Sequence, residues 1–248
     1  MQDSHTRHVL RKSEGHMKSG QNKHWNKYVL MLIVLLVAAA GFIVRSSLSR
    51  EAVSTNELQE LVNMVQASKS TIALDNQREA SISKILSIIS RYNKTMADSE
   101  RVAIANEIYL MSQKYPNINV DFICATITHE SGKTWDPKVV SRVGALGLMQ
   151  IMPTTGAFLA AEEGIEWTSP RSVLFDPILN IRLGCRYLND LVGLYEQDGG
   201  LAAYNGGPRR AEMWLASNRN NKILYRETRE YVPAVLKLYH EFKSADLL

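Results

Sequence analysis

Residues 121–132 read DFICATITHESG, an apolar segment with helical spacing that ends in a histidine, a glutamate and a glycine. Asp121 is a candidate N-cap and Gly132 is placed to end the helix, so the pattern predicts a short helix over 122–130. Glu130 then stands at the negative end of the helix dipole, which opposes its ionisation by ~0.3–1 kcal/mol. Partial burial would raise its pKa further. Glu130 is therefore a candidate general acid, although a lone Glu-Ser pair is more often a solvated surface feature.

Helical patterns continue on both sides of this segment, and the alternation typical of strands is scarce. Asp98 is a candidate N-cap for the preceding helix, and Pro233 is expected in the first turn of the last one. A short irregular or β-like segment is expected at 139–147. The fold class predicted is mainly α. Further helices are expected at 154–163, 177–195, 201–203, 209–217 and 232–242.

The run from Tyr28 to Val44 is uncharged and would measure roughly 26 Å as a helix, close to the ~30 Å hydrocarbon core of a membrane. Lysine and arginine are concentrated before the run, which predicts a cytoplasmic N-terminus. A cleaved signal peptide, with residues 38–40 as the cleavage site, is the alternative. Both interpretations place residues 45–248 outside the inner membrane, and we favour the uncleaved anchor.

The formal net charge of +4 on these 248 residues belongs to the leader. Residues 1–27 carry six basic and two acidic side chains, so the remainder is neutral. A basic patch for nucleic acid is therefore absent from the folded part, and we expect no nucleic-acid partner.

The chain divides into a leader, an apolar segment, a stalk and a folded domain. Residues 45–97 carry helical stripes that could pack on the domain, on each other or on a second chain, and the sequence leaves these open. The predicted parts are a cytoplasmic basic leader (1–27), a transmembrane anchor or signal peptide (28–44), a helical stalk (45–97) and the domain (98–248).

The two cysteines, Cys124 and Cys185, stand in apolar helical patterns. They could form a disulfide in an oxidising compartment, but buried free thiols are the simpler interpretation. The spacing typical of metal-binding cysteines is absent, so no metal site is expected.

Two more segments carry polar groups beside glycines. Residues 144–150 read GALGLMQ, where small residues allow close backbone approach and Gln150 offers a donor and an acceptor. Residues 203–207 read AYNGG, with a phenol and an amide before a permissive turn. Each segment taken alone could be an ordinary turn.

The order and spacing of these segments are more specific than any one of them. Glu130-Ser131, GLMQ at 147–150, AYNGG at 203–207 and ETREYV at 227–232 resemble the catalytic domain of the soluble lytic transglycosylase family over residues 98–242. The resemblance implies a lysozyme-like helical domain with a glycan groove and Glu130 as the catalytic acid. Gly206, where the family often has alanine, is a mild departure. The groove residues implied are Ser141, Met149, Gln150, Tyr204, Asn205, Glu227 and Tyr231.

The resemblance also implies cleavage of the MurNAc-GlcNAc bond of peptidoglycan to leave 1,6-anhydro-MurNAc ends. No second carboxylate, cofactor or metal is then needed, and Tyr204 is expected to hydrogen-bond near Glu130 and orient it. A goose-type-like lysozyme, which is a hydrolase, and a non-catalytic peptidoglycan-binding anchor are the alternatives. Expected partners are the glycan strand and the inner membrane through residues 28–44. Cell-envelope machinery, or self-association through the stalk, is left open.

Overall fold

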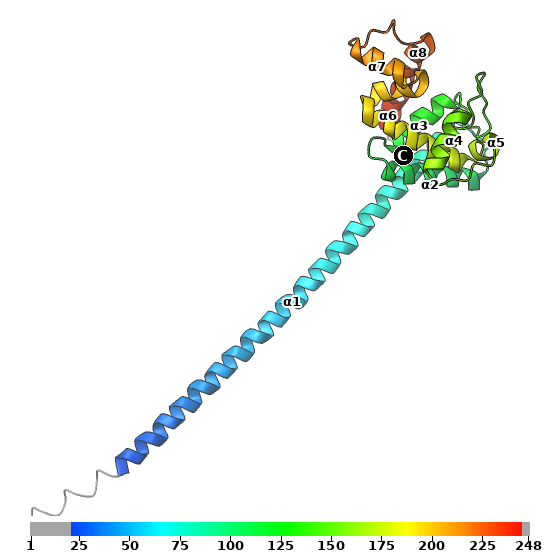
Figure 1. Ribbon diagram of the computed structural model, residues 1–248. Helices are drawn as coiled ribbons and strands as arrows, with labels where there is room; N and C mark the ends of the chain where they lie inside the picture. Colours follow the sequence, from blue (N-terminus) through cyan, green and yellow to red (C-terminus); the bar gives the residue numbers. More distant parts are fainter. Residues whose placement is uncertain (1–20, 245–248) are drawn as a thin grey trace, which may run out of the picture. The chain divides into compact units, whose positions relative to one another are not determined.

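The chain was analysed as a computed structural model that describes residues 21–244, with the side chains of that range except those of residues 21–24, 26, 50–54 and 56. Most of the predicted leader and residues 245–248 therefore lie outside the described residues. The helices, labelled in Figure 1, are α1 (Gln21–Tyr92), α2 (Asp98–Lys114), α3 (Val120–Glu130), α4 (Pro153–Glu162), α5 (Pro170–Leu174), α6 (Pro177–Gly206), α7 (Pro208–Ala216) and α8 (Arg226–Ser244).

The mainly α fold predicted from the sequence is confirmed. Within residues 21–244 the only β-type pairing consists of two isolated bridges, Val140 with Leu146 and Leu146 with Ile151. They confirm the β-like segment expected at 139–147. Backbone hydrogen bonds within the segment hold its shape, for example those from the Ser141 N–H to the Ala145 carbonyl and from the Gly147 N–H to the Val139 carbonyl, each at 2.9 Å.

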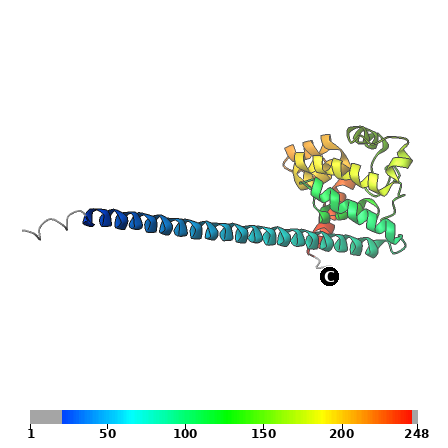
Figure 2. The ribbon, with the colours of Figure 1, turned by 90° about the horizontal axis from the view of Figure 1, so that it is seen from below.

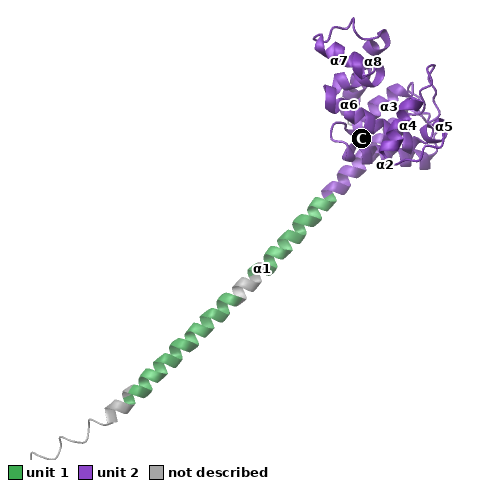
Figure 3. Ribbon diagram, in the orientation of Figure 1, with its two compact units in different colours: residues 1–72 green, residues 73–248 purple. Residues whose placement is uncertain are grey.

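The chain divides into two compact units, residues 1–72 and 73–248, coloured separately in Figure 3. The described part of the first unit belongs to α1. It includes the span Lys27–Ser49, which by length and composition could cross a membrane. An apolar helix near the N-terminus is compatible with a membrane anchor and equally with a signal sequence.

The second unit contains the end of α1 and helices α2–α8, which Figures 1 and 2 show gathered into one body. Its most buried helix is α3, in which every residue from Phe122 to Thr128 is buried. A helix that is apolar on all sides is stable only inside a core. Here α3 packs against α2 and α8, while α6 packs against α2, α7 and α8. The end of this buried helix carries Glu130, as predicted.

The compact unit begins at Ala73, whereas the sequence suggests a domain that begins at residue 98. The difference has a physical reason, because Ile85, Ile88 and Ile89 of α1 are at most 1% exposed and belong to the core. The helical stripe that was expected in the stalk therefore packs on the domain. The assignment of roles to the four predicted segments stays a prediction.

Three predicted helix starts differ from the structure. The N-cap of α3 is Asn119, whose side chain accepts from the Phe122 N–H at 3.0 Å, and Asp121 instead pairs with Lys84 at 2.7 Å. Asp98 is the first residue of α2 and its carboxylate pairs with Arg101. The expectation for Pro233 was wrong, since α8 already begins at Arg226 and Pro233 lies inside it. Proline has no N–H to donate within the helix, and the packing of α8 against α3 and α6 compensates for this missing hydrogen bond.

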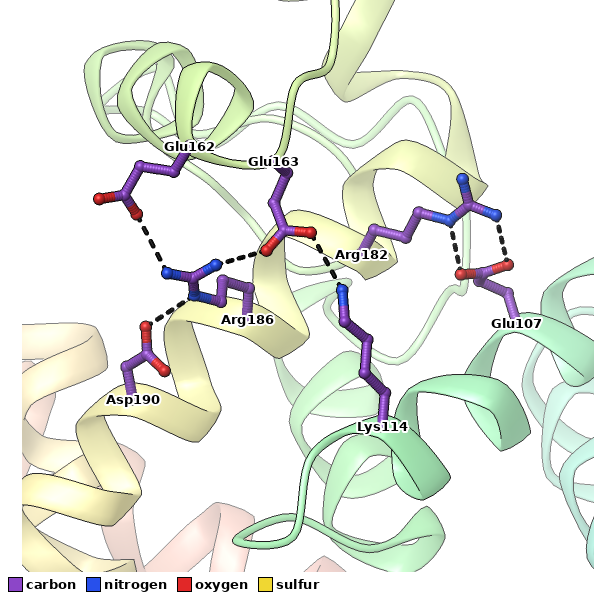
Figure 4. Close-up of polar contacts among 7 residues, drawn as sticks. All are labelled: Glu107, Lys114, Glu162, Glu163, Arg182, Arg186 and Asp190. Carbon is purple, nitrogen blue, oxygen red and sulfur yellow. Dashed lines mark hydrogen bonds and ion pairs between the residues drawn. The ribbon is translucent and has the colours of Figure 1, made fainter.

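Charged side chains join α2, α4 and α6 (Figure 4). Arg182 of α6 makes two hydrogen bonds to Glu107 of α2, at 2.7 and 3.1 Å, and Glu107 is only 4% exposed. Arg186 binds Glu162, Glu163 and Asp190, and Glu163 also binds Lys114. A buried carboxylate of this kind is tolerated because its guanidinium partner is bidentate. The pairs fix α6, which carries two of the predicted site residues, Tyr204 and Asn205.

Candidate active site

Glu130 is the last residue of α3 and is partly buried. Burial raises the pKa of its carboxyl from 4.5 to about 7, the nearby Tyr231 hydroxyl acts to lower it, and the charge of Glu227 raises it. A carboxyl group with a pKa near neutrality can hold a proton and also give it away. Glu130 is thus suited to act first as an acid and then as a base.

Tyr231 of α8 lies beside this carboxyl and also contacts His129 of α3. Tyr231 is 3% exposed, and its ring meets the His129 ring edge to face, with centroids 4.8 Å apart. Its hydroxyl makes no hydrogen bond of ordinary length and angle within the described residues, although it lies near enough to Glu130 to influence that carboxyl. Burial, and then the charge of Glu130, raise the pKa of Tyr231. The phenol therefore stays protonated beside the acid.

The loop over residues 139–151 carries three predicted site residues. Met149 is fully buried, while Ser141 and Gln150 are partly buried. The Gln150 amide donates to the carbonyls of Gly147, at 2.8 Å, and Val139, at 3.2 Å. The Ser141 Oγ accepts from the Ala145 N–H at 2.9 Å. The donors of Gln150 thus shape the loop itself, a role that the sequence did not indicate.

Asn180 of α6 holds this loop and was not among the predicted site residues. Its Oδ1 accepts from the Met149 N–H at 2.8 Å, and its Nδ2 donates to the Leu146 and Leu174 carbonyls, each at 2.9 Å. Asn180 is fully buried, and a buried amide is tolerated when its hydrogen bonds are made. The signal in the sequence was an amide within an otherwise apolar helical pattern.

Tyr204 and Asn205 come from the end of α6. The Tyr204 hydroxyl donates to the Met149 carbonyl at 2.7 Å, so the expected hydrogen bond near Glu130 goes to the loop instead. Burial raises the pKa of Tyr204, and the charge of Glu130 raises it further, so the two groups are close. The Asn205 Oδ1 accepts from Thr228 Oγ1 of α8 at 2.7 Å. These bonds join the loop, α6 and α8 around Glu130.

Gly206 is the position at which the sequence departs from the resemblance. A Cβ atom there would lie 2.8 Å from Thr228 Oγ1 and 3.1 Å from Thr228 Cγ2. Because Thr228 is buried and bonded to Asn205, it has little freedom to move aside. Glycine thus matches the close approach of α6 and α8, and the departure is less mild than expected.

The structure links most of the predicted residues into one site. Tyr204 of α6 is hydrogen-bonded to Met149, and the next residue, Asn205, is hydrogen-bonded to α8. Glu227 and Tyr231 act on Glu130 from α8. Ser141 belongs to the same loop but contacts its own turn. Cys124 and Cys185 are buried free thiols, which confirms the interpretation favoured from the sequence, and the Cys185 thiol contacts the Met149 sulfur at 3.9 Å.

Comparison with known protein families and sequences gives this site a context. The family described as Transglycosylase SLT domain matches residues 107–226. Soluble lytic murein transglycosylase of Escherichia coli K12 is 36% identical over 151 residues, which cover 55% of this chain and 23% of the relative. The protein of the same name from Salmonella typhimurium LT2 is 34% identical over 151 residues, with the same coverage. The chain thus spans about a quarter of the length of these relatives.

Comparison with solved structures leads to the same proteins. The 70 kDa soluble lytic transglycosylase of Escherichia coli matches with a TM-score of 0.50 and 32% identity, covering 57% of this chain and 25% of the other. Its complex with bulgecin A matches with the same score and identity, covering 57% and 24%. Since identity of this level accompanies a shared fold, the resemblance inferred from the four motifs is confirmed: this chain contains a transglycosylase SLT domain and is homologous there to the soluble lytic murein transglycosylases.

Proposed function

We propose that this protein is a peptidoglycan lytic transglycosylase in which Glu130 is the single catalytic acid and base. The observation that carries the proposal is the pKa of about 7 at the end of α3, caused mainly by burial. The homology to soluble lytic murein transglycosylases supports the substrate class. The phenols of Tyr204 and Tyr231 close to Glu130 support the same assignment, because they can hold a polar ligand around the acid.

The reaction proposed needs one carboxyl group, which acts first as an acid and then as a base. Glu130 gives its proton to the oxygen between MurNAc and GlcNAc as the bond from C1 of MurNAc to that oxygen breaks. The acetamido group of the substrate stabilises the cationic centre at C1. Glu130 then takes the proton of the C6 hydroxyl as its oxygen bonds to C1, which closes the 1,6-anhydro ring and consumes no water. Holding the hydroxyl beside C1 gives it an effective concentration that solvent cannot match.

Ser141, Met149, Gln150, Tyr204, Asn205, Glu227 and Tyr231 are proposed to line the glycan groove. The hydrogen bonds described above make several of them positioning groups: Tyr204 supports the backbone of Met149, and Gln150 supports the loop. The acceptor oxygen of Gln150 and the amide nitrogen of Asn205 are then the polar atoms proposed to meet the sugar.

The products of purified peptidoglycan test this proposal. Muropeptides lighter by one water than lysozyme products, with no new reducing ends, are expected by mass spectrometry. In water labelled with heavy oxygen, an anhydro product takes up no label. The Glu130→Gln variant, which cannot donate the proton, should release neither kind of product. Labelled reducing ends would contradict transglycosylation.

A hydrolase is the second candidate, and the observation in its favour is Glu227. This exposed carboxylate from the start of α8 is close enough to act on Glu130, and ordinary glycosidases use two carboxyl groups. If Glu227 activated water, Glu227→Gln would abolish cleavage and wild-type products would carry solvent oxygen. Under transglycosylation the same variant keeps the anhydro product.

We further propose that residues 28–44 anchor the protein in the inner membrane, with a cytoplasmic N-terminus and a periplasmic domain. The apolar span Lys27–Ser49 and the basic residues before it support this orientation. A reporter fused after residue 50 should be active only outside the cytoplasm, and the mature protein should stay in the membrane fraction. A mature N-terminus near Gly41 would instead identify a cleaved signal peptide.

A further inference from the structure

A cavity of about 780 Å³ lies outside the site described so far, between the turn that joins α1 to α2 and the loop that follows Glu130. Within the described part of the chain, none of the predicted site residues lines it. One wall comes from residues 91–96, which precede the matched family segment, and another from residues 133–138. Ligand sites in proteins commonly have volumes of roughly 300–1,000 Å³, so the space suits a ligand of several groups.

The walls of this cavity are bonded to each other and to α3. Asn93 Oδ1 accepts from the Met96 N–H at 2.9 Å and fixes the α1–α2 turn, while Asn93 Nδ2 donates to the Trp135 carbonyl at 3.3 Å. The buried Trp135 indole donates to Thr128 Oγ1 at 3.0 Å. The Lys133 N–H donates to the Thr128 carbonyl at 2.8 Å. Since Thr128 is two residues before Glu130, the cavity has a fixed position relative to the acid.

The charges around the cavity are mixed, with cations in excess. Lys94, Lys133 and Lys138 line it with exposed side chains, and among the described residues none of the three has an ion-pair partner. Arg91 also lines it, but its guanidinium is paired with Glu241 at 2.9 Å. The carboxylates that line it are those of Glu100 and Asp136. The carboxylates of Glu100 and Asp136 would repel a ligand that carries only negative charges. The lining therefore suits a ligand that has several carboxylates and also an amine.

We propose that this cavity binds the peptide stem carried by the glycan strand, with the stem carboxylates at Lys94, Lys133 and Lys138. The inference rests on the proposed function, because it names a second part of the same substrate. Peptidoglycan stems combine carboxylates with free or cross-linked amines and small aliphatic side chains. Glu100 and Asp136 match the amines, and Met96 and Phe175 give the cavity an apolar portion. The stem is bound at the loop that follows Glu130 in the sequence. A stem held there fixes which sugar of the glycan strand lies at Glu130.

The first experiment compares cleavage of two substrates, peptidoglycan with its stems and the same glycan stripped of them by an amidase. The chain of residues 1–248 is used in detergent, as wild type and as the triple variant Lys94→Gln, Lys133→Gln and Lys138→Gln. A matched control replaces three exposed lysines elsewhere, Lys69→Gln, Lys237→Gln and Lys243→Gln. Two or three exposed charge contacts give a wild-type preference for the peptide-bearing substrate of about tenfold in kcat/KM. The preference falls to about one in the cavity variant and persists in the control.

The second experiment measures binding without catalysis. Each of the three chains also carries Glu130→Gln, and calorimetry compares a disaccharide that bears a stem peptide with the peptide-free disaccharide. Tighter binding of the peptide-bearing ligand, lost in the cavity variant and weakened by salt, supports the proposal. The proposal is overturned if the chain with Glu130→Gln alone binds both ligands equally. It is also overturned if the cavity variant still binds the peptide-bearing ligand more tightly. If the chain cleaves neither substrate, the proposed function fails, and the binding result still decides whether the cavity accepts a stem.

Discussion

The hydroxyl of Tyr204 donates a 2.7 Å hydrogen bond to the main-chain carbonyl of Met149. This bond joins the end of α6 to the loop over residues 139–151, while the Met149 N–H is held from the other side by Asn180. Both polar groups of the Met149 peptide backbone are therefore used to place the loop beside Glu130. We therefore expect Tyr204 to influence the proposed acid, Glu130, mainly through the position of this loop.

Replacing Tyr204 with phenylalanine removes this bond and leaves the ring in place. We expect a loss of stability of about 1 kcal/mol, because the Met149 carbonyl loses its donor. We expect kcat to fall about tenfold, since a loop displaced by a fraction of an ångström misplaces the sugar. Tyr195→Phe is the matched control: Tyr195 is also on α6, and its hydroxyl binds Glu212. Equal activity of both variants would contradict the positioning role.

The rate of cleavage should fall as pH rises through about 7, because the proposed catalytic acid, Glu130, has to be protonated to donate. The charge of Glu227 contributes to the raised pKa of Glu130, so Glu227→Gln should move the inflection to lower pH. Glu230→Gln, which removes an exposed carboxylate paired with Arg226, should leave it unchanged. Profiles of kcat/KM on a soluble glycan oligomer provide the measurement. An inflection at pH 4.5 in wild type would mean that burial does not raise this pKa.

The same pKa predicts how stability depends on pH. Between pH 4.5, the ordinary value, and about 7, folded Glu130 keeps a proton that the unfolded chain releases. This contribution is full below the window and is lost as pH rises through it. The upper bound of its size is about 3.4 kcal/mol, since one unit of pKa corresponds to about 1.4 kcal/mol. Glu130→Gln should therefore gain in Tm relative to wild type at pH 8 but hardly at pH 4.5. A constant Tm difference at both pH values would show that another group is responsible.

Two glycines in the same loop provide a matched pair of substitutions. Gly144 and Gly147 both have φ above +80°, so alanine is strained at either, by about 1–2 kcal/mol. A Cβ at Gly147 would also lie 2.2 Å from the Leu174 carbonyl oxygen and from Asn180 Nδ2, whereas Gly144 has open space. Chemical denaturation should show Gly147→Ala as several kcal/mol less stable than Gly144→Ala. Activity should be lost in the first and largely kept in the second.

Local patterns were sufficient for part of the fold. The end of the buried helix at Glu130 and the turn at Gly132, where φ is +60°, follow from residues close in sequence. The starts of α2, α3 and α8 did not follow from these patterns. Lys84, for example, takes the carboxylate of Asp121 that was expected to cap α3.

The site shows the same division. The motifs made Glu130, Met149 and Tyr204 candidate site residues, since the spacing of the motifs is distinctive even where the partners of these residues are unknown. The partners themselves could not be predicted: the Tyr204 hydroxyl binds a backbone carbonyl 55 positions earlier, and the Gln150 amide binds its own loop. A hydrogen bond to a carbonyl leaves no trace in the acceptor's side chain. Sequence patterns therefore point to the residues of a site more readily than to their bonds.

The contribution of α1 to the core sets limits on how this domain could be cut or transplanted. The matched family segment begins at residue 107, yet Ile85, Ile88 and Ile89 lie in the core, and Asn93 is bonded to the loop after Glu130. A fragment that starts at residue 107 would open a hole where these three isoleucines pack, at a cost of several kcal/mol. An excised enzyme, or a chimera that exchanges SLT domains, would have to carry the chain from residue 73 onward. The segment that the family shares, residues 107–226, and the compact folded unit, residues 73–248, thus have different boundaries.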